Sequence, residues 1–236
     1  FDAVEGLSDG KRPLTPERDY ARMAQRVLSF LTVMTPSGRL YEVDTRLRPN
    51  GRAGSLVSTL TAFRDYQLNQ AWTWELQALT RAQFVAGDRE VSVQFNRIRQ
   101  DVLCRQRSEP DLAAELFDMR ERMNREHSGH RAIDLQRSPK YRPGGLIDID
   151  FVAQLGVLAS ARLYPRVLQA TGTLGQLHEL RGIAWLSDDE AGVLEHTVVG
   201  LRRQRLTAAL LQGGNPEEVN TAAAAEIFRL TLSPEP

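Results

Sequence analysis

Residues 41–49 bring together the side chains on which metal and phosphate chemistry depends. The stretch reads YEVDTRLRP, and in an extended chain successive side chains point to opposite faces. One face then carries Glu42, Asp44, Arg46 and Arg48, and the other is apolar enough to enter a core. Carboxylate oxygens suit Mg²⁺, and guanidinium groups bind phosphate oxygens bidentately. The stretch is therefore a candidate site for a metal and a polyphosphate, although a strand with a solvated, salt-bridged outer face would show the same pattern.

The motifs that follow are more distinctive. Residues 50–88 continue with NGRAGSLV, FRDY and AWTWELQAL, and residues 140–151 read KYRPGGLIDIDF. Together these motifs resemble the glutamine synthetase adenylyltransferase/adenylyl-removing enzyme family, and the resemblance fades after about residue 165. That family attaches AMP to a tyrosine of glutamine synthetase and removes it, with one nucleotidyltransferase domain for each direction. The AWTWE segment is more similar to that of the adenylylating domain than to that of the removing domain, which usually has a DWER-type segment.

The resemblance implies an α+β fold with two domains. A truncated, polymerase-β-like nucleotidyltransferase domain with a mixed sheet is expected over residues 1–88. An all-α helical bundle, similar to the domain associated with PII-uridylyltransferases, is expected over residues 89–236. In the family a D-x-D pair precedes a strand end that Phe1 and Asp2 match. We therefore expect a fragment whose first two metal-binding carboxylates lie upstream, and which is inactive alone.

The same resemblance assigns roles to the first candidate site. Asp44 is expected to be the third carboxylate, the catalytic ligand of the Mg²⁺ that activates the acceptor tyrosine oxygen. Arg46 and Arg48 are expected to bind phosphates of the co-substrate ATP, or else to pair with Glu42 or a neighbouring helix. Glutamine synthetase is the implied protein substrate, and a PII-type signalling protein is a further possible partner.

A second candidate site lies at the entrance of a long apolar segment. Lys140 and an arginine precede Gly144 and Gly145, which open a predicted helix with Asp148 in its first turn. Free N–H groups at a helix start favour an anion, so these residues are candidates for nucleotide binding. Acids in a first turn are also favoured simply as capping residues. The segment resembles the K-x-x-x-G-G-L-x-D-I-E-F pattern of the family, except that Asp150 stands where glutamate is usual.

Apolar periodicity predicts a chain made mostly of helices. Strands are predicted at residues 41–49 and 82–86, and Ser187 with Glu190 forms a capping box. Helices are predicted over residues 15–34, 61–70, 72–79, 91–102, 112–123, 146–164 and 174–180, and from Ser187 to a turn at residues 213–216, with an alanine-rich helix near the end. Trp72 and Trp74, with Glu75, are interpreted as core and interdomain packing residues rather than as a platform for adenine.

Composition excludes several classes of function. Thirty basic residues balance 30 acidic ones, so no field draws the chain to nucleic acid, and a template-dependent polymerase is disfavoured. No apolar run approaches the ~20 residues that span a bilayer, and nothing resembles a signal peptide. The single cysteine, Cys104, rules out an internal disulfide and suits a reducing, cytoplasmic location. Three functions stay open: adenylylation, phosphorolytic removal of AMP, and a non-catalytic docking module.

Overall fold

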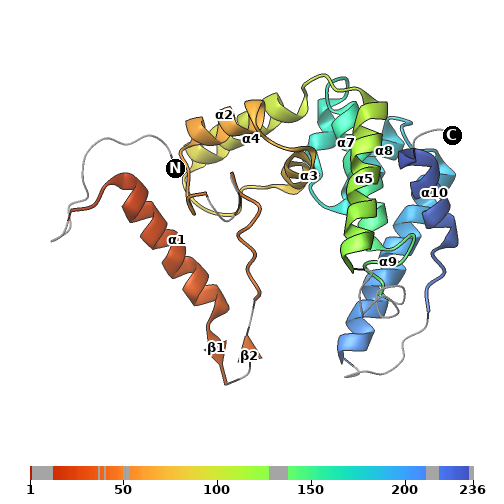
Figure 1. Ribbon diagram of the computed structural model, residues 1–236, viewed down its shortest axis with the longest axis horizontal. Coiled ribbons are helices and arrows are strands. Elements are labelled where there is room, and N and C mark those ends of the chain that lie inside the picture. The colour runs from red at the N-terminus through yellow and green to blue at the C-terminus, as the bar shows by residue number, and fades with distance from the viewer. Residues whose placement is uncertain are drawn as a thin grey trace. The chain divides into compact units, whose positions relative to one another are not determined.

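The computed structural model describes residue 1 and residues 13–36, 38–39, 41–49, 51, 54–127, 138–210 and 218–233, and these are mostly helical (Figure 1). The first elements are α1 (Pro16–Thr32), β1 (Met34–Thr35), β2 (Gly38–Arg39), α2 (Leu60–Asn69), α3 (Thr73–Arg81) and α4 (Arg89–Leu103). They are followed by α5 (Glu109–His127), α7 (Leu146–Ser160), the 3₁₀ helix η2 (Pro165–Gln169), α8 (Thr173–Gly182), α9 (Asp188–Leu210) and α10 (Ala222–Leu232). The helices expected from the sequence are confirmed to within a few residues at each end. Asp2 and the turn predicted at residues 213–216 lie outside the described residues.

The chain divides into two compact units. Unit 1 comprises residues 1–78 and 84–102, and unit 2 comprises residues 79–83 and 103–236. The domain boundary expected at residue 88 falls inside unit 1. Helix α3 belongs to unit 1 through Ala78 and to unit 2 from Leu79 onward.

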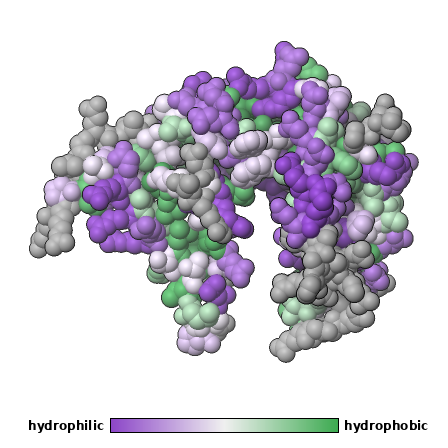
Figure 2. Space-filling view, in the orientation of Figure 1, coloured by the Kyte–Doolittle hydropathy of each residue, from purple (hydrophilic) through white to green (hydrophobic). Residues whose placement is uncertain are grey.

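Unit 1 is thinly packed around its first helix. Helix α1 has no buried residue, and large apolar side chains such as Phe30, Val27 and Met23 are more than half exposed. Figure 2 shows this hydrophobic surface over α1. The strands β1 and β2 form a two-residue antiparallel hairpin, with Met34 opposite Arg39. Helix α2 begins at a capped end, where Thr59 Oγ1 accepts a hydrogen bond from the N–H of Ala62 at 3.1 Å.

The strands predicted at residues 41–49 and 82–86 are absent. A strand needs a partner to share its hydrogen bonds, and residues 41–49 make local bonds instead. The N–H of Arg48 donates to the carbonyl of Arg46 at 2.9 Å, and that of Gly51 to the carbonyl of Arg48 at 2.8 Å. The expected core-facing side chains are exposed as well: Tyr41 is 55% exposed and Leu47 is 65% exposed. The prediction of one buried face was therefore wrong for these residues.

Unit 2 is a helical bundle centred on α7. Twelve of its 15 residues are buried, because α7 contacts α5, α8, α9 and α10 on its several sides. Ile149, Leu155, Val157 and neighbouring side chains have no exposed surface. The helix predicted over residues 146–164 ends at Ser160, and the chain continues into η2 at Pro165. The continuous apolar run of α7 is thus the signature of a helix that is buried all round.

Candidate functional site

Asp44 and Arg46 form an exposed ion pair. Arg46 Nη2 lies 2.5 Å from Asp44 Oδ2, and Arg46 Nε donates to both carboxylate oxygens at 2.9 Å. The Arg46 side chain is 62% exposed and the Asp44 side chain is 51% exposed. Hydrogen bonding to Asp44, together with its charge, raises the pKa of the Arg46 guanidinium. A dissolved cation can therefore reach the Asp44 carboxylate, where it would compete with Arg46.

Arg48 binds the backbone rather than an acid. Its Nη1 donates to the carbonyl oxygen of Thr45, and its Nη2 lies 3.5 Å from that of Gly54. Its Nε is buried and has no hydrogen-bond partner within the described part of the chain. Of the residues predicted to share one face, the structure therefore joins Asp44 to Arg46 and leaves Arg48 apart.

Asp44 fits a magnesium site as a single ligand. Its oxygens are anionic, hard and exposed, which is the donor type that Mg²⁺ takes. Among the residues that the structure describes, no three His, Cys, Asp or Glu side chains are placed to hold a metal together. The remaining ligands of such a site would have to come from outside these residues.

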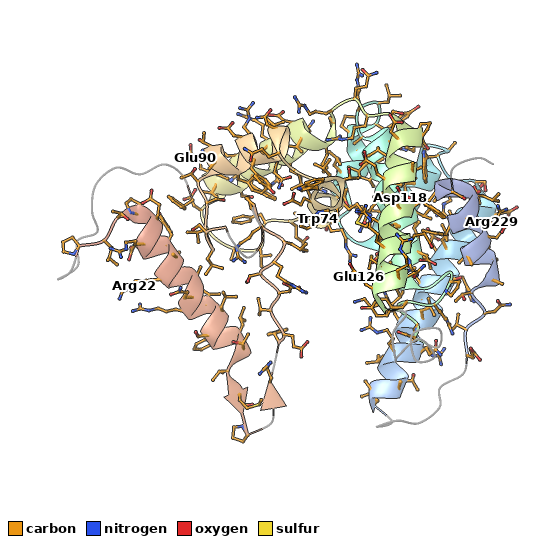
Figure 3. The ribbon with its side chains drawn as sticks, viewed as in Figure 1. Arg22, Trp74, Glu90, Asp118, Glu126 and Arg229 are labelled. Atoms are coloured by element: carbon orange, nitrogen blue, oxygen red, sulfur yellow. The ribbon has the colours of Figure 1, made fainter. Side chains whose placement is uncertain are left out.

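Glu75 is a buried carboxylate in the first turn of α3. It is 5% exposed, and it accepts hydrogen bonds from Tyr66 Oη at 3.0 Å and from the N–H of Trp72 at 2.9 Å. Trp72 and Trp74, interpreted with Glu75 as packing residues, are 70% and 38% exposed and so lie outside the core. Figure 3 labels Trp74 on α3. An acid in a helix's first turn gives no sequence signal of burial, because such residues are usually solvated caps.

The entrance of α7 uses its own N–H groups internally. The N–H of Gly145 donates to the carbonyl of Arg142 at 2.8 Å, and that of Leu146 to the carbonyl of Pro139 at 3.0 Å. The N–H of Ile147 donates to the carbonyl of Lys140 at 3.2 Å. These are the donors that an anion at the helix start would need. The geometry here favours a structural helix entrance over a phosphate site on the backbone.

Gly144 and Gly145 are required by close packing. Gly144 has φ +68°, and a Cβ on it would lie 2.2 Å from the carbonyl oxygen of Thr221. A Cβ on Gly145 would lie 2.7 Å from the carbonyl oxygen of Arg142. Gly144 therefore lets the turn before α7 press against the start of α10, and Gly145 lets that turn close tightly on itself.

Asp148 belongs to a buried ion pair with Arg120 of α5. Arg120 Nε lies 2.6 Å from Asp148 Oδ1, both side chains are at most 5% exposed, and the N–H of Gly144 donates to Asp148 Oδ2 at 2.7 Å. Burial raises the pKa of the Asp148 carboxyl, because the loss of hydration outweighs the stabilisation of the carboxylate by Arg120 and by the N–H of Gly144. Asp148 thus links α5, the turn and α7, and it is closed to solvent. Arg120 was missed because it lies 28 residues away in sequence.

Lys140 and Asp150 lie at the surface of the same region of unit 2. The Lys140 side chain is exposed, with its ammonium 5.0 Å from the centre of the Tyr141 ring. Asp150 accepts hydrogen bonds from Arg81 at 2.9 Å and from Thr173 Oγ1 at 2.6 Å. The Lys140 ammonium is therefore a charge that a ligand could reach.

Comparisons with known proteins match the chain in two parts. Residues 1–98 match the family described as glutamate-ammonia ligase adenylyltransferase, and residues 115–230 match the family described as GlnD PII-uridylyltransferase. No helix in the described residues is both long and apolar enough to cross a membrane.

Three relatives show how much of a longer protein this chain represents. Each is a bifunctional glutamine synthetase adenylyltransferase/adenylyl-removing enzyme. The one from Methylococcus capsulatus is 45% identical over 192 residues, which are 80% of this chain and 20% of the relative. Those from Xanthomonas axonopodis pv. citri and Xanthomonas campestris pv. campestris are 44% and 42% identical, over 79% and 86% of this chain and 20% and 22% of theirs. The chain, which spans about a fifth of the length of these relatives, therefore belongs to the glutamine synthetase adenylyltransferase/adenylyl-removing enzyme family.

Proposed function

We propose that this segment serves, within a longer enzyme, the transfer of AMP from ATP to a tyrosine hydroxyl of glutamine synthetase. The observation that carries the proposal is the exposed Asp44–Arg46 pair, which lies in the part of the chain that matches the adenylyltransferase family. The names of the relatives supply the reaction class and the protein substrate. The AWTWE segment, at residues 71–75, favours the adenylylating direction.

Asp44 and Arg46 would have separate roles in this reaction. When bound, Mg²⁺ would lower the pKa of the acceptor hydroxyl and offset charge on the phosphates. Asp44 would supply one oxygen ligand, and its engagement would release the Arg46 guanidinium to a phosphate oxygen. Lys140 stays a prediction for a nucleotide phosphate, through its exposed side chain.

Two alternatives have specific support. Phosphorolytic removal of AMP would use the same ligands in reverse, and the relatives are named for both activities. A docking role for unit 2 toward a PII-type protein is favoured by the match of residues 115–230 to PII-uridylyltransferases. These alternatives differ in whether a change at Asp44 affects adenylylation, removal or neither.

The test is Asp44→Asn in the full-length enzyme that contains this segment. The change preserves size and removes the charge that a hard cation requires, so adenylylation in a single turnover should fall at least ~100-fold. The melting temperature should barely change, because an exposed ion pair contributes only about 0–1 kcal/mol.

The matched control is Glu42→Gln, which changes another exposed acid of the same segment. It should lose much less activity than Asp44→Asn. Adenylylation near the normal rate in Asp44→Asn, or equal losses in the two variants, would contradict the proposal. Loss of AMP removal with intact adenylylation would assign the segment to the reverse reaction.

A further inference from the structure

A cleft lies within unit 2, between the turn that precedes α7 and the start of α10. Its volume is about 550 Å³, within the range of small-molecule sites. Arg142 and Pro143 line it from the turn, and residues 218–222 line it from the segment that leads into α10. The close approach of Gly144 to Thr221 holds the two walls together.

Arg142 places a buried cation in the wall of this cleft. It is 6% exposed, and its Nη2 donates to the carbonyl of Val219 at 2.8 Å and to Gln204 Oε1 at 3.3 Å. Its Nε is buried with no hydrogen-bond partner among the described residues. The acid that pairs with it, Glu218, lies 3.6 Å from Nη1 and is 82% exposed. A buried guanidinium whose paired acid is 3.6 Å away and largely solvated favours the binding of a closer anion.

The start of α10 adds a second, independent attraction for an anion. Its N-cap residue, Thr221, makes no capping hydrogen bond with its side chain, because the hydroxyl donates to the carbonyl of Pro143 at 2.8 Å. No acidic residue occupies the first turn of α10. Asn220 Oδ1 accepts a hydrogen bond from the first N–H of the helix, that of Ala222, at 3.0 Å. The rest of the first turn has no acid beside it and presents the positive end of the helix dipole to an anion.

From these observations we propose that the cleft binds a phosphate group of a small metabolite. Arg142 Nη1 is its cation, and the first turn of α10 supplies further donors. Glu218 occupies the guanidinium weakly when the ligand is absent and is displaced when it binds. A planar guanidinium fork beside a helix start suits phosphate oxygens in particular. Every residue of this site lies in unit 2, whereas the Asp44–Arg46 pair belongs to unit 1.

The proposal is tested by titrating the 236-residue chain with inorganic phosphate, followed by calorimetry and by thermal unfolding. Sodium chloride at equal ionic strength corrects for screening. Saturable binding of phosphate above the chloride response is expected. Arg142→Gln should weaken it at least tenfold. Arg229→Gln is the matched control, since Arg229 is an exposed arginine of α10 that pairs with Glu226 and does not line the cleft (Figure 3).

Glu218→Gln gives an independent test that does not depend on the folding of an Arg142 variant. It removes the competing charge from an exposed position, so phosphate should bind about two- to fivefold more tightly, as expected for loss of an exposed ion pair. Unchanged or weaker binding in Glu218→Gln would overturn the proposal. A phosphate response no larger than that of chloride, or equal losses in Arg142→Gln and Arg229→Gln, would also overturn it. Tighter binding of succinate than of phosphate would replace the phosphate assignment with a carboxylate.

Discussion

Removing Arg120 from the buried Arg120–Asp148 pair should lower the free energy of unfolding more than removing Asp148 does. Arg120 keeps two other acceptors: Nη2 donates to the carbonyl of Tyr141 at 2.8 Å, and Nη1 donates to Asn124 Oδ1. Asp148 has, besides Arg120, the N–H of Gly144 at 2.7 Å. Arg120→Met therefore leaves a buried carboxylate with one neutral donor, whereas Asp148→Asn leaves a guanidinium with two oxygens.

The magnitudes follow from that asymmetry. Removing one partner of a buried pair costs about 3–5 kcal/mol when the remaining charge is uncompensated, which is the expectation for Arg120→Met. Methionine is as good a helix former as arginine, so α5 itself should persist. In Asp148→Asn the amide N–H₂ must face one of the two donors, Arg120 Nε or the N–H of Gly144, and this mismatch should cost about 1–3 kcal/mol. The double change Arg120→Met with Asp148→Leu removes both charges and should recover much of the loss.

The dependence on pH has a definite sign. Burial already raises the pKa of Asp148, and loss of Arg120 would raise it further. A carboxyl whose folded pKa is raised adds stability below its unfolded pKa, and that stability is lost as the pH rises through the folded value. The deficit of Arg120→Met should consequently be smaller at about pH 4 than at about pH 7.

The measurement is amide hydrogen exchange of α7, with the unchanged chain as reference at each pH. A probe confined to unit 2 is needed, because a chain of two compact units need not unfold in one step. An Asp148→Asn deficit equal to or larger than that of Arg120→Met, or a deficit of Arg120→Met that does not vary with pH, would refute the reasoning.

Two further predictions concern single positions in unit 2. Gly144→Ala forces a Cβ to 2.2 Å from the carbonyl oxygen of Thr221 at φ +68°, and should lower the free energy of unfolding by about 3 kcal/mol or more. Gly192→Ala lies in α9 with nothing within 4 Å of the new Cβ, and should raise the free energy of unfolding by about 0.5–1 kcal/mol. Both effects are measured by amide hydrogen exchange in α7 and α9. Ser187→Ala should cost about 1 kcal/mol at neutral pH by removing the capping box. Because the Ser187 hydroxyl lowers the pKa of Glu190 below its ordinary 4.5, that cost should shrink as the pH falls through the lowered value, and a constant cost in an acid titration would contradict this origin.

Local signals in the sequence predicted the helices well. The capping box is present, with the N–H of Glu190 donating to Ser187 Oγ at 3.2 Å and that of Ser187 donating to Glu190 Oε2 at 2.9 Å. The apolar run of α7 predicted a buried helix because helix formation depends on neighbours one to four residues away, and a helix that is apolar on all sides must be covered by other elements. The strand at residues 41–49 failed for the opposite reason. A strand depends on a partner segment, and alternation of side chains alone cannot supply one.

The two glycines before α7 show where the sequence could not decide between a ligand site and a packing requirement. Residue types at the entrance suited an anion, and both interpretations predicted glycine there. The structure separates them through contacts that no local pattern contains. Gly144 is fixed by Thr221, and Arg142 donates to a carbonyl 77 residues away. The backbone donors of α7 are consumed by its own turn, while the buried cation lines a cleft at the start of α10. The anion-binding chemistry expected at one helix start is therefore better met at another, which only the folded chain brings beside Arg142.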